Sequence, residues 1–213
     1  MTADSIRWAI CRFGEKMRQC ADELNALDGA LGDGDLGVNM LRAAERLTKD
    51  VMPGLPDDVG LALLKCAQAF TSVSASTYGT LLATGLMAAA RLTKGRAEVS
   101  WAETSSLAGA ALKAMSDRGQ GQLGDKTVLD AVEAARRATD GLRDPAALAA
   151  AAHAAIQEAL SELRGRQFRQ GRARIFGVKG IGLDDPGMVA LLRIVESLLP
   201  VGPNCAEAGV THR

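Results

Sequence analysis

Three aspartates lie close together in a glycine-rich stretch of the chain. Residues 27–40 read LDGALGDGDLGVNM, in which Asp28, Asp33 and Asp35 carry negative charges without a lysine or arginine among them. A helix cap explains one such aspartate and a turn explains another. Three neighbouring carboxylates, however, repel one another unless a cation lies among them. The stretch is therefore read in two ways, as a magnesium–phosphate site, since Mg²⁺ prefers oxygen ligands and phosphate, or as a structural loop.

Two familiar motifs do not account for this stretch. Its spacing lacks the alternating oxygen ligands and the final glutamate of an EF-hand loop. The chain also has no G-x-x-x-x-G-K-S/T sequence, so a Walker-type phosphate loop is excluded.

Three further polar breaks add possible anion contacts. Residues 74–77, SAST, precede a predicted helix, whose start favours an anion, although a simple hydroxyl cap, taken alone, is the more usual explanation. Residues 171–174, GRAR, lie in a basic stretch, where arginine pairs well with phosphate but is usually a solvated surface residue. Residues 184–187, DDPG, form a helix-start signal whose glycine also allows close approach of a flat ligand.

The remaining sequence predicts an all-α protein. Apolar residues repeat at three, four and seven positions in the first segment, and Asp144–Pro145 and Asp185–Pro186 are helix-start signals. Asp125 is the expected cap of a sixth helix. Eight helices are predicted, with mostly short connections that favour an antiparallel bundle or closed ring. Their ranges are about 4–27, from 35 or 36 towards 52, 58–71, 81–92, 101–117, 126–142, 144–163 and 184–200.

Composition limits the classes of function. The 213 residues suit one domain, predicted over 1–199 with a tail at 200–213, and 25 basic residues balance 25 acidic ones. Neutral charge and 3% aromatic residues argue against nucleic-acid and membrane partners. The four cysteines, at positions 11, 20, 66 and 205, lack metal-ligand spacing and are interpreted as free thiols in a reducing compartment. Residues 1–20 do not resemble a signal peptide. A cytoplasmic location is expected.

Four motifs, in this order along the chain, resemble one family. They are LDGALGDGDLGVNM, RGQGQLGDKTVLDAV, GRA and GIGLDDPG, and the resemblance extends from about Ala21 to Leu199. Together they are similar to the nucleotide-binding (L-type) subunit or domain of the dihydroxyacetone kinases. The resemblance implies an eight-helix antiparallel barrel that binds ADP or ATP at one end through two Mg²⁺ ions.

Matching the motifs position by position implies a set of site residues. Asp28, Asp33 and Asp35 would be the magnesium ligands. The residues that would contact the nucleotide are Leu36, Gly37, Val38 and Asn39 at the phosphates, Ala75 and Ser76 at a phosphate turn, Gly119 and Val128 at the adenosine, Arg172 in GRA, and Asp185, Pro186 and Gly187 beside the adenine and ribose.

The resemblance also implies an activity and partners. Family kinases phosphorylate a short-chain ketose or triose, and in two-subunit systems a separate protein binds the sugar while this domain delivers the phosphoryl group. The donor is free ATP in some members and a phosphotransferase-system protein that recharges bound ADP in others. Leu36 replaces the histidine of the family's usual D-H-G, and SAST replaces a glycine-richer turn. These departures leave the sugar and the donor open.

Three interpretations follow from the sequence. The first is a kinase subunit that requires a ketose-binding partner, and the second is a nucleotide-sensing regulatory subunit without phosphoryl transfer. The third is a helical interaction module whose acidic loop only caps helices. Magnesium-dependent nucleotide binding separates the first two from the third.

Overall fold

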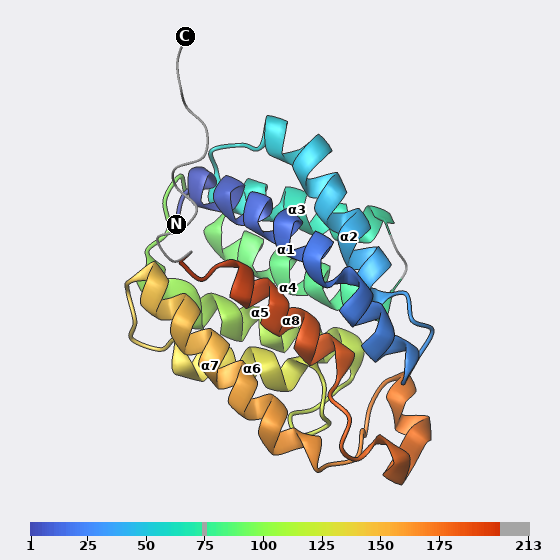
Figure 1. Cartoon of the computed structure of the whole chain (residues 1–213). Coiled ribbons are helices and arrows are strands. Elements are labelled where there is room, and N and C mark those ends of the chain that lie inside the picture. Colours follow the sequence, from blue (N-terminus) through green and yellow to red (C-terminus); the bar gives the residue numbers. More distant parts are fainter. Residues whose placement is uncertain (74–75, 201–213) are drawn as a thin grey trace.

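A computed structural model describes residues 1–73 and 76–200 of the chain. The described part contains eight α-helices and no strand, which confirms the predicted all-α fold (Figure 1). The helices are α1 (Ala3–Gly29), α2 (Leu36–Arg46), α3 (Val59–Val73), α4 (Thr77–Thr93), α5 (Thr104–Gly119), α6 (Val128–Ala138), α7 (Pro145–Arg164) and α8 (Pro186–Ser197). Four short helical segments connect them: η1 (Leu47–Val51), η2 (Met52–Gly54), η3 (Trp101–Glu103) and η4 (Arg172–Gly180).

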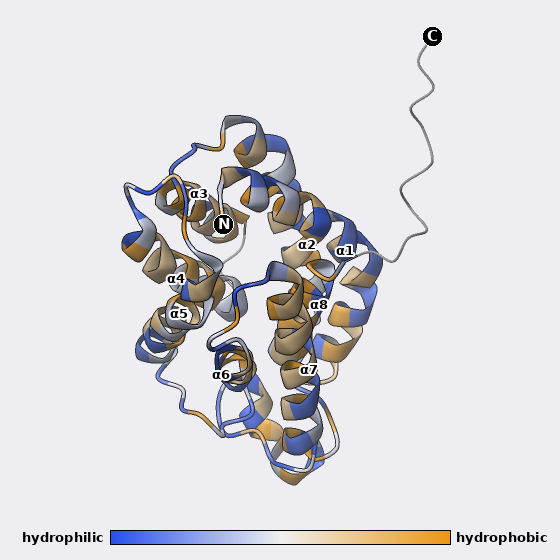
Figure 2. Cartoon of the chain, turned by 90° about the vertical axis from the view of Figure 1, so that its left-hand side faces the viewer, coloured by the Kyte–Doolittle hydropathy of each residue, from blue (hydrophilic) through white to orange (hydrophobic). Residues whose placement is uncertain are grey.

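The helices form a closed ring. Each α-helix contacts the next one along the chain, and α8 contacts α1. Successive helices run in alternating directions (Figure 1). Figure 2 shows α3 to α6 on one side of the ring and α2, α1, α8 and α7 on the other. Because the directions alternate, all even-numbered helices begin at the same end of the molecule.

A continuous apolar core fills the ring. It includes Met17 and Leu24 of α1, Met40 of α2, Ile156 of α7 and Met188 of α8, each at most 2% exposed. Within the described residues, no helix is both long enough and apolar enough to cross a membrane.

Two glycines allow neighbouring helices to approach closely. A Cβ atom on Gly37 of α2 would lie 1.9 Å from the carbonyl oxygen of Ala21 in α1. A Cβ on Gly60 of α3 would lie 2.5 Å from the Cα of Lys94, just after α4. Both positions therefore require glycine for packing.

Several predicted helix starts are confirmed, and two are wrong. The helix α4 begins at Thr77, four residues before the expected start at residue 81. Asp144 and Asp185 cap α7 and α8 and accept hydrogen bonds from the N–H groups of Ala147 and Met188. The cap of α6 is Thr127 instead of Asp125. Lys126 has a φ of +63°, so the chain changes direction after Asp125 and the helix begins two residues later than expected.

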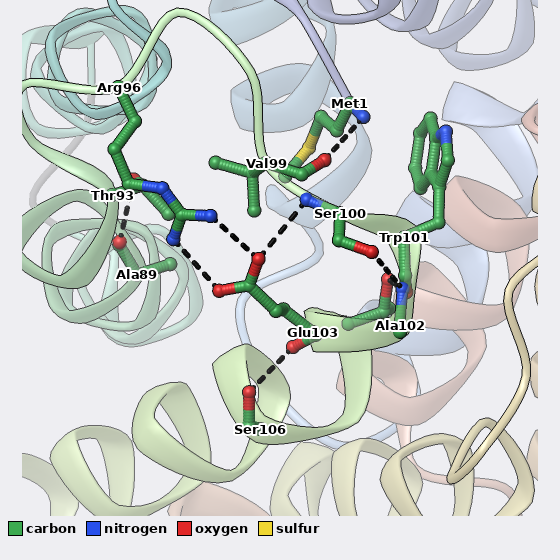
Figure 3. A network of polar contacts seen from close by, with 11 residues as sticks. Met1, Ala89, Thr93, Arg96, Val99, Ser100, Trp101, Ala102, Glu103 and Ser106 are labelled. Carbon is green, nitrogen blue, oxygen red and sulfur yellow. Dashed lines mark hydrogen bonds and ion pairs between the residues drawn. The ribbon is translucent and has the colours of Figure 1, made fainter.

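The end of the ring opposite the starts of the even helices is closed by polar contacts. Arg96 forms a two-pronged ion pair with Glu103, at 2.7 and 2.8 Å, and Glu103 also accepts the N–H of Ser100 (Figure 3). The amino group of Met1 donates to the carbonyl of Val99 in the same network. The arginine holds the pKa of Glu103 down, at about 2. These contacts fasten the connection between α4 and α5.

The cysteines agree with the expectation of free thiols as far as the structure describes them. Cys11, Cys20 and Cys66 are unpaired, and burial raises the pKa of Cys66 to about 12. Cys205 lies outside the described residues.

Candidate functional site

The three aspartates converge at one end of the ring. Asp28 lies in the last turn of α1, which extends past the expected end at residue 27; Asp33 lies in the following loop, and Asp35 directly precedes α2. Each offers a carboxylate oxygen, and these oxygens lie within 4.8 Å of one another. Such a set of oxygen ligands fits a hard divalent cation.

Asp28 has a structural role in this cluster as well. One of its carboxylate oxygens accepts the N–H groups of Asp35 at 3.0 Å and Leu36 at 3.2 Å. Asp35 itself makes no side-chain cap. The start of α2 is therefore held by an aspartate from the preceding helix.

Arg172, from η4, supplies a positive charge to the cluster. Its guanidinium forms an ion pair with Asp33. This contact lowers the pKa of Asp33, and the pKa of Arg172 is raised mainly by the same contact, with smaller contributions from Asp35 and Asp28. The charge that is missing from residues 27–40 is thus provided from far along the chain.

A cavity of about 440 Å³ opens beside the aspartates. Its lining includes the first residues or caps of all four even helices, α2, α4, α6 and α8. The residues at these starts are Leu36, Ser76 and Thr77, Thr127 and Val128, and Asp185 to Gly187. Helix N-termini carry the positive end of the helix dipole, so four of them around one cavity favour an anionic ligand.

Part of the lining is apolar. Leu81, Met115, Val128 and Leu129 line it next to Tyr78. The Tyr78 hydroxyl is buried and has no hydrogen-bond partner in the part of the chain that the structure describes. One cavity therefore combines acidic, anion-attracting and apolar walls, which suits a ligand with a charged and a flat apolar part.

Asp185 is the titratable group most affected by this environment. Burial raises its pKa to about 7, and the negative charge of Asp130 adds to the shift. The N–H groups of Met188 and Gly187 and the charge of Lys126 oppose it. Asp185 also raises the pKa of Tyr78, although burial is the larger cause.

Most of the residues named from the sequence line this cavity. They are Asp28, Asp33, Asp35, Leu36, Ser76, Gly119, Val128, Arg172, Asp185, Pro186 and Gly187. Leu36, where the family histidine is expected, is 6% exposed and also belongs to the apolar core. Ala75 lies outside the described residues.

Three of the named residues are not part of the cavity lining. Gly37 packs against the backbone of α1, the N–H of Val38 donates to the side chain of Asn25, and Asn39 is buried. Gly37 and the backbone N–H of Val38 therefore meet α1. Their expected contact with phosphates remains a prediction.

Sequence reasoning missed Tyr78, Thr127 and Gln170, which also line the cavity. Tyr78 is the single tyrosine of the chain and directly follows the SAST break, and Thr127 belongs to the quoted G-D-K-T. Gln170 directly precedes GRA and donates to the carbonyl of Gly119 at 2.9 Å. Their positions next to recognised motifs were the available signal.

The closed helical ring and the site at its end define an all-α domain with a candidate metal–anion centre. Residues 30–200 match the family model described as the DAK2 domain, so the chain belongs to the DAK2 domain family.

Relatives with a described activity share this domain. The chain is 29% identical to the ADP-binding subunit DhaL of the PEP-dependent dihydroxyacetone kinase of Escherichia coli, covering 91% of this chain and 93% of the relative. It is 28% identical to the ADP-binding subunit DhaL of the PTS-dependent dihydroxyacetone kinase of Lactococcus lactis, covering 94% of this chain and 98% of the relative. It is 30% identical to the L-erythrulose 1-kinase of Mycolicibacterium smegmatis, covering 84% of this chain but 33% of that protein.

A solved structure has the same fold. The dihydroxyacetone kinase of C. freundii in complex with AMP-PNP and Mg²⁺ superposes with a TM-score of 0.74 at 22% identity. The match covers 92% of this chain and 33% of that one, so this chain spans about a third of the solved kinase. At 22% sequence identity, this structural similarity demonstrates a shared fold.

Proposed function

We propose that this chain is the ATP- or ADP- and Mg²⁺-binding phosphoryl-transfer subunit of a dihydroxyacetone-type kinase, acting on a short-chain ketose held by a separate sugar-binding subunit. The observation that carries the proposal is the convergence of three aspartate oxygens within 4.8 Å beside the cavity. Relatives that match along nearly their whole length are described as ADP-binding subunits, which supports the same assignment. The nucleotide-binding kinase domain spans residues 1–199, and residues 200–213 are a tail.

Asp28, Asp33 and Asp35 would hold the magnesium, as two ions. Bound Mg²⁺ neutralises negative charge on the phosphates, which is the main requirement of phosphoryl transfer. Arg172 lines the same cavity and is 69% exposed in its side chain, so its guanidinium has room to leave Asp33 and contact a phosphate. Arginine is well suited to this exchange because its planar group pairs with carboxylate and phosphate alike.

The two kinds of cavity wall divide the nucleotide between them. The phosphates lie at the starts of α2 and α4, near Leu36 and Ser76, where dipoles and N–H groups favour negative charge. The adenosine lies along Gly119, Val128 and the Asp185–Gly187 turn. The proposed phosphate contacts also include Gly37, Val38 and Asn39 at the start of α2 and Ala75 in the phosphate turn.

Several exposed apolar residues lie close in sequence to residues that line the cavity, which supports a docking partner. We call this set the apolar rim; its members are Leu123, Ile175, Val178, Ile181 and Leu183, which are 39% to 82% exposed. Each is within five residues of a residue that lines the cavity. Exposed apolar residues gathered in one region are typical of protein–protein contacts. The ketose-binding subunit would cover this rim when the phosphoryl group is transferred.

Leu36 supports a second candidate function. A buried leucine stands at the position of the family histidine, and leucine can neither donate a hydrogen bond nor carry charge. A nucleotide-sensing regulatory subunit, which binds ADP without transferring phosphate, needs no such group. ATP consumption that requires both a small ketose and the sugar-binding subunit would favour the kinase, and its absence despite nucleotide binding would favour the sensor. The same assay, run with either free ATP or a phosphotransferase protein, also tests which of the two is the phosphoryl donor.

Isothermal titration tests the nucleotide and metal assignments. We expect ADP and ATP to bind the wild-type protein in the presence of Mg²⁺ and much more weakly without it. The double variant Asp33→Asn/Asp35→Asn should lose at least about tenfold in affinity, equivalent to about 1.4 kcal/mol. A matched control, Asp57→Asn/Asp140→Asn, changes two exposed aspartates outside the cavity lining and should bind normally. No nucleotide binding by the wild type overturns the proposal, and equal binding by the two double variants overturns the metal assignment.

A further inference from the structure

Lys126 is a buried lysine in a strained backbone position. It is 1% exposed, which makes it the largest of the fully buried side chains, and its φ of +63° is uncommon for a residue other than glycine. It lies between the 120–125 loop and the cap of α6 and does not line the cavity. A buried charge requires compensation from its surroundings.

That compensation comes from direct contacts with backbone carbonyls, and the negative charges of Asp184 and Asp185 add to it. The Lys126 ammonium donates to the carbonyl oxygens of Arg166 at 2.8 Å, Arg164 at 3.2 Å and Gly180 at 3.4 Å. It also lies 4.2 Å from the centre of the Phe168 ring, a cation–π contact. Among the described residues, no carboxylate lies within ion-pair distance of this ammonium. Arg164 and Gly180 are the last residues of α7 and η4, whose carbonyls lack helical partners.

The three carbonyls belong to the two ends of one segment. Residues 164–166 begin the connection between α7 and α8, and Gly180 ends η4 within it. The segment between these ends carries Gln170, Gly171, Arg172 and Ala173, which line the cavity. In Figure 1 this orange part of the chain extends at the lower corner of the molecule, next to the loop that follows α1.

Other contacts hold this segment in its middle and at its ends. Gln170 donates to the carbonyl of Gly119, Arg172 pairs with Asp33, and Phe168 and Ala173 pack against Leu31. Gly182 donates to the carbonyl of Arg164, and Arg164 pairs with Asp184. Arg169 donates to the carbonyl of Asp125, the residue before Lys126. The ammonium contacts both ends of the segment and its buried aromatic ring together.

We propose that the Lys126 ammonium is a positioning residue that joins both ends of residues 164–180 and thereby holds Gln170 and Arg172 at the cavity. The consequence for ligand binding rests on the proposed nucleotide site, whereas the effect on the segment itself does not. Replacing the ammonium by an apolar group leaves the carbonyl of Arg166 without this donor and removes one of two donors from the carbonyls of Arg164 and Gly180, so the segment opens more often.

Limited proteolysis of the nucleotide-free protein tests this directly. The segment offers trypsin six sites: Arg164, Arg166, Arg169, Arg172, Arg174 and Lys179. Lys126→Met keeps most of the apolar stem and removes the charge. We expect cleavage in the segment, located by mass spectrometry, to be at least about tenfold faster. The loss of a hydrogen bond from a charged group shifts the equilibrium between the closed and open segment by about this factor. Lys113→Met, at an exposed lysine of α5, is the matched control and should leave cleavage unchanged.

A second measurement uses the wild-type protein and does not depend on how the variant folds. In ¹⁵N-lysine-labelled protein, an ammonium held by three carbonyls should give a slowly exchanging side-chain signal at neutral pH, unlike exposed lysines. Absence of this signal, or wild-type cleavage rates in a folded Lys126→Met, overturns the proposal.

Titration separates the anchoring role from the nucleotide site. If the wild type binds Mg²⁺–ADP, Lys126→Met should weaken it at least about fivefold while Mn²⁺ binding at the aspartates is retained, since a shift of the segment displaces Arg172 but none of the three carboxylates. Unchanged Mg²⁺–ADP affinity in a variant whose segment is cleaved faster overturns the positioning role. If the wild type does not bind Mg²⁺–ADP, the proposed function fails, and the proteolysis and NMR results still decide the anchoring role.

Discussion

Single residues in this protein combine structural and candidate binding roles. Asp28 caps α2 and belongs to the acidic cluster, and Asp185 caps α8 and lines the cavity. Arg172 neutralises Asp33 and is the candidate phosphate contact. A ligand that binds here therefore exchanges existing protein contacts for new ones, which links its affinity to the local structure.

The raised pKa of Asp185 predicts a pH dependence of stability. Its pKa rises from 3.8 to about 7 on folding, mainly because of burial. Between these two pH values, the folded protein binds more protons than the unfolded chain. The stability that Asp185 contributes is therefore fully present below about pH 4 and is lost as the pH rises through about 7. Asp185→Asn keeps a capping side chain but does not titrate.

Urea unfolding of the nucleotide-free proteins between pH 4 and 8 checks this expectation. The free energy of unfolding of Asp185→Asn should rise relative to that of the wild type across this range. Parallel pH profiles of the two proteins would mean that Asp185 is not perturbed in this way.

At the level of elements, the approach of α1 and α2 sets the position of the acidic cluster. The two helices are in contact, and Asp28 and Asp35 lie at the two ends of their connection. Gly37, in the first turn of α2, permits this spacing. The role of this glycine in the protein is thus helix packing, whatever contact it makes with a ligand.

Gly37→Ala should destabilise the protein by about 3 kcal/mol, because the added methyl group meets the rigid backbone of α1 and forces the helices apart. Gly54→Ala is a suitable control, since a Cβ there meets nothing within 4 Å, and its effect should stay within about 1 kcal/mol. Chemical unfolding followed by circular dichroism measures both. Equal effects of the two substitutions would contradict the proposed packing role.

For the whole molecule, the decisive property is the alternating direction of helices in a closed ring. It gathers the starts of α2, α4, α6 and α8 at one end, together with their dipoles and N–H groups. The Arg96–Glu103 network closes the other end. The candidate site consequently lies at one end of the ring, and the residues of the proposed apolar rim flank it in the sequence.

The apolar rim gives a prediction about that partner. Val178→Glu places a charge at a residue that is 69% exposed and should leave Mg²⁺–ADP binding unchanged. Ketose phosphorylation with a limiting amount of the sugar-binding subunit should fall by about tenfold, because a charge in a buried interface is strongly unfavourable. Leu92→Glu, at an exposed leucine near the other end of α4, is the matched control. Equal rates for the two variants would exclude Val178 from the docking surface.

The sequence by itself determined the elements and most candidate residues. Helix periodicity and the Asp144–Pro145 and Asp185–Pro186 signals predicted helices correctly because these interactions act within one turn. The cap of α6 was assigned wrongly because the left-handed conformation of Lys126 depends on its burial, which no local pattern records. The three aspartates could be recognised as a cluster because they are also close in sequence.

The tertiary structure alone decided which distant groups meet. The pairing of Arg172 with Asp33, the capture of three carbonyls by Lys126 and the convergence of four helix starts all require closure of the ring. Sequence fixes the length and polarity of each helix through contacts between near neighbours. Contacts between residues far apart depend on how all eight helices pack together, so they exist only once the whole core has formed.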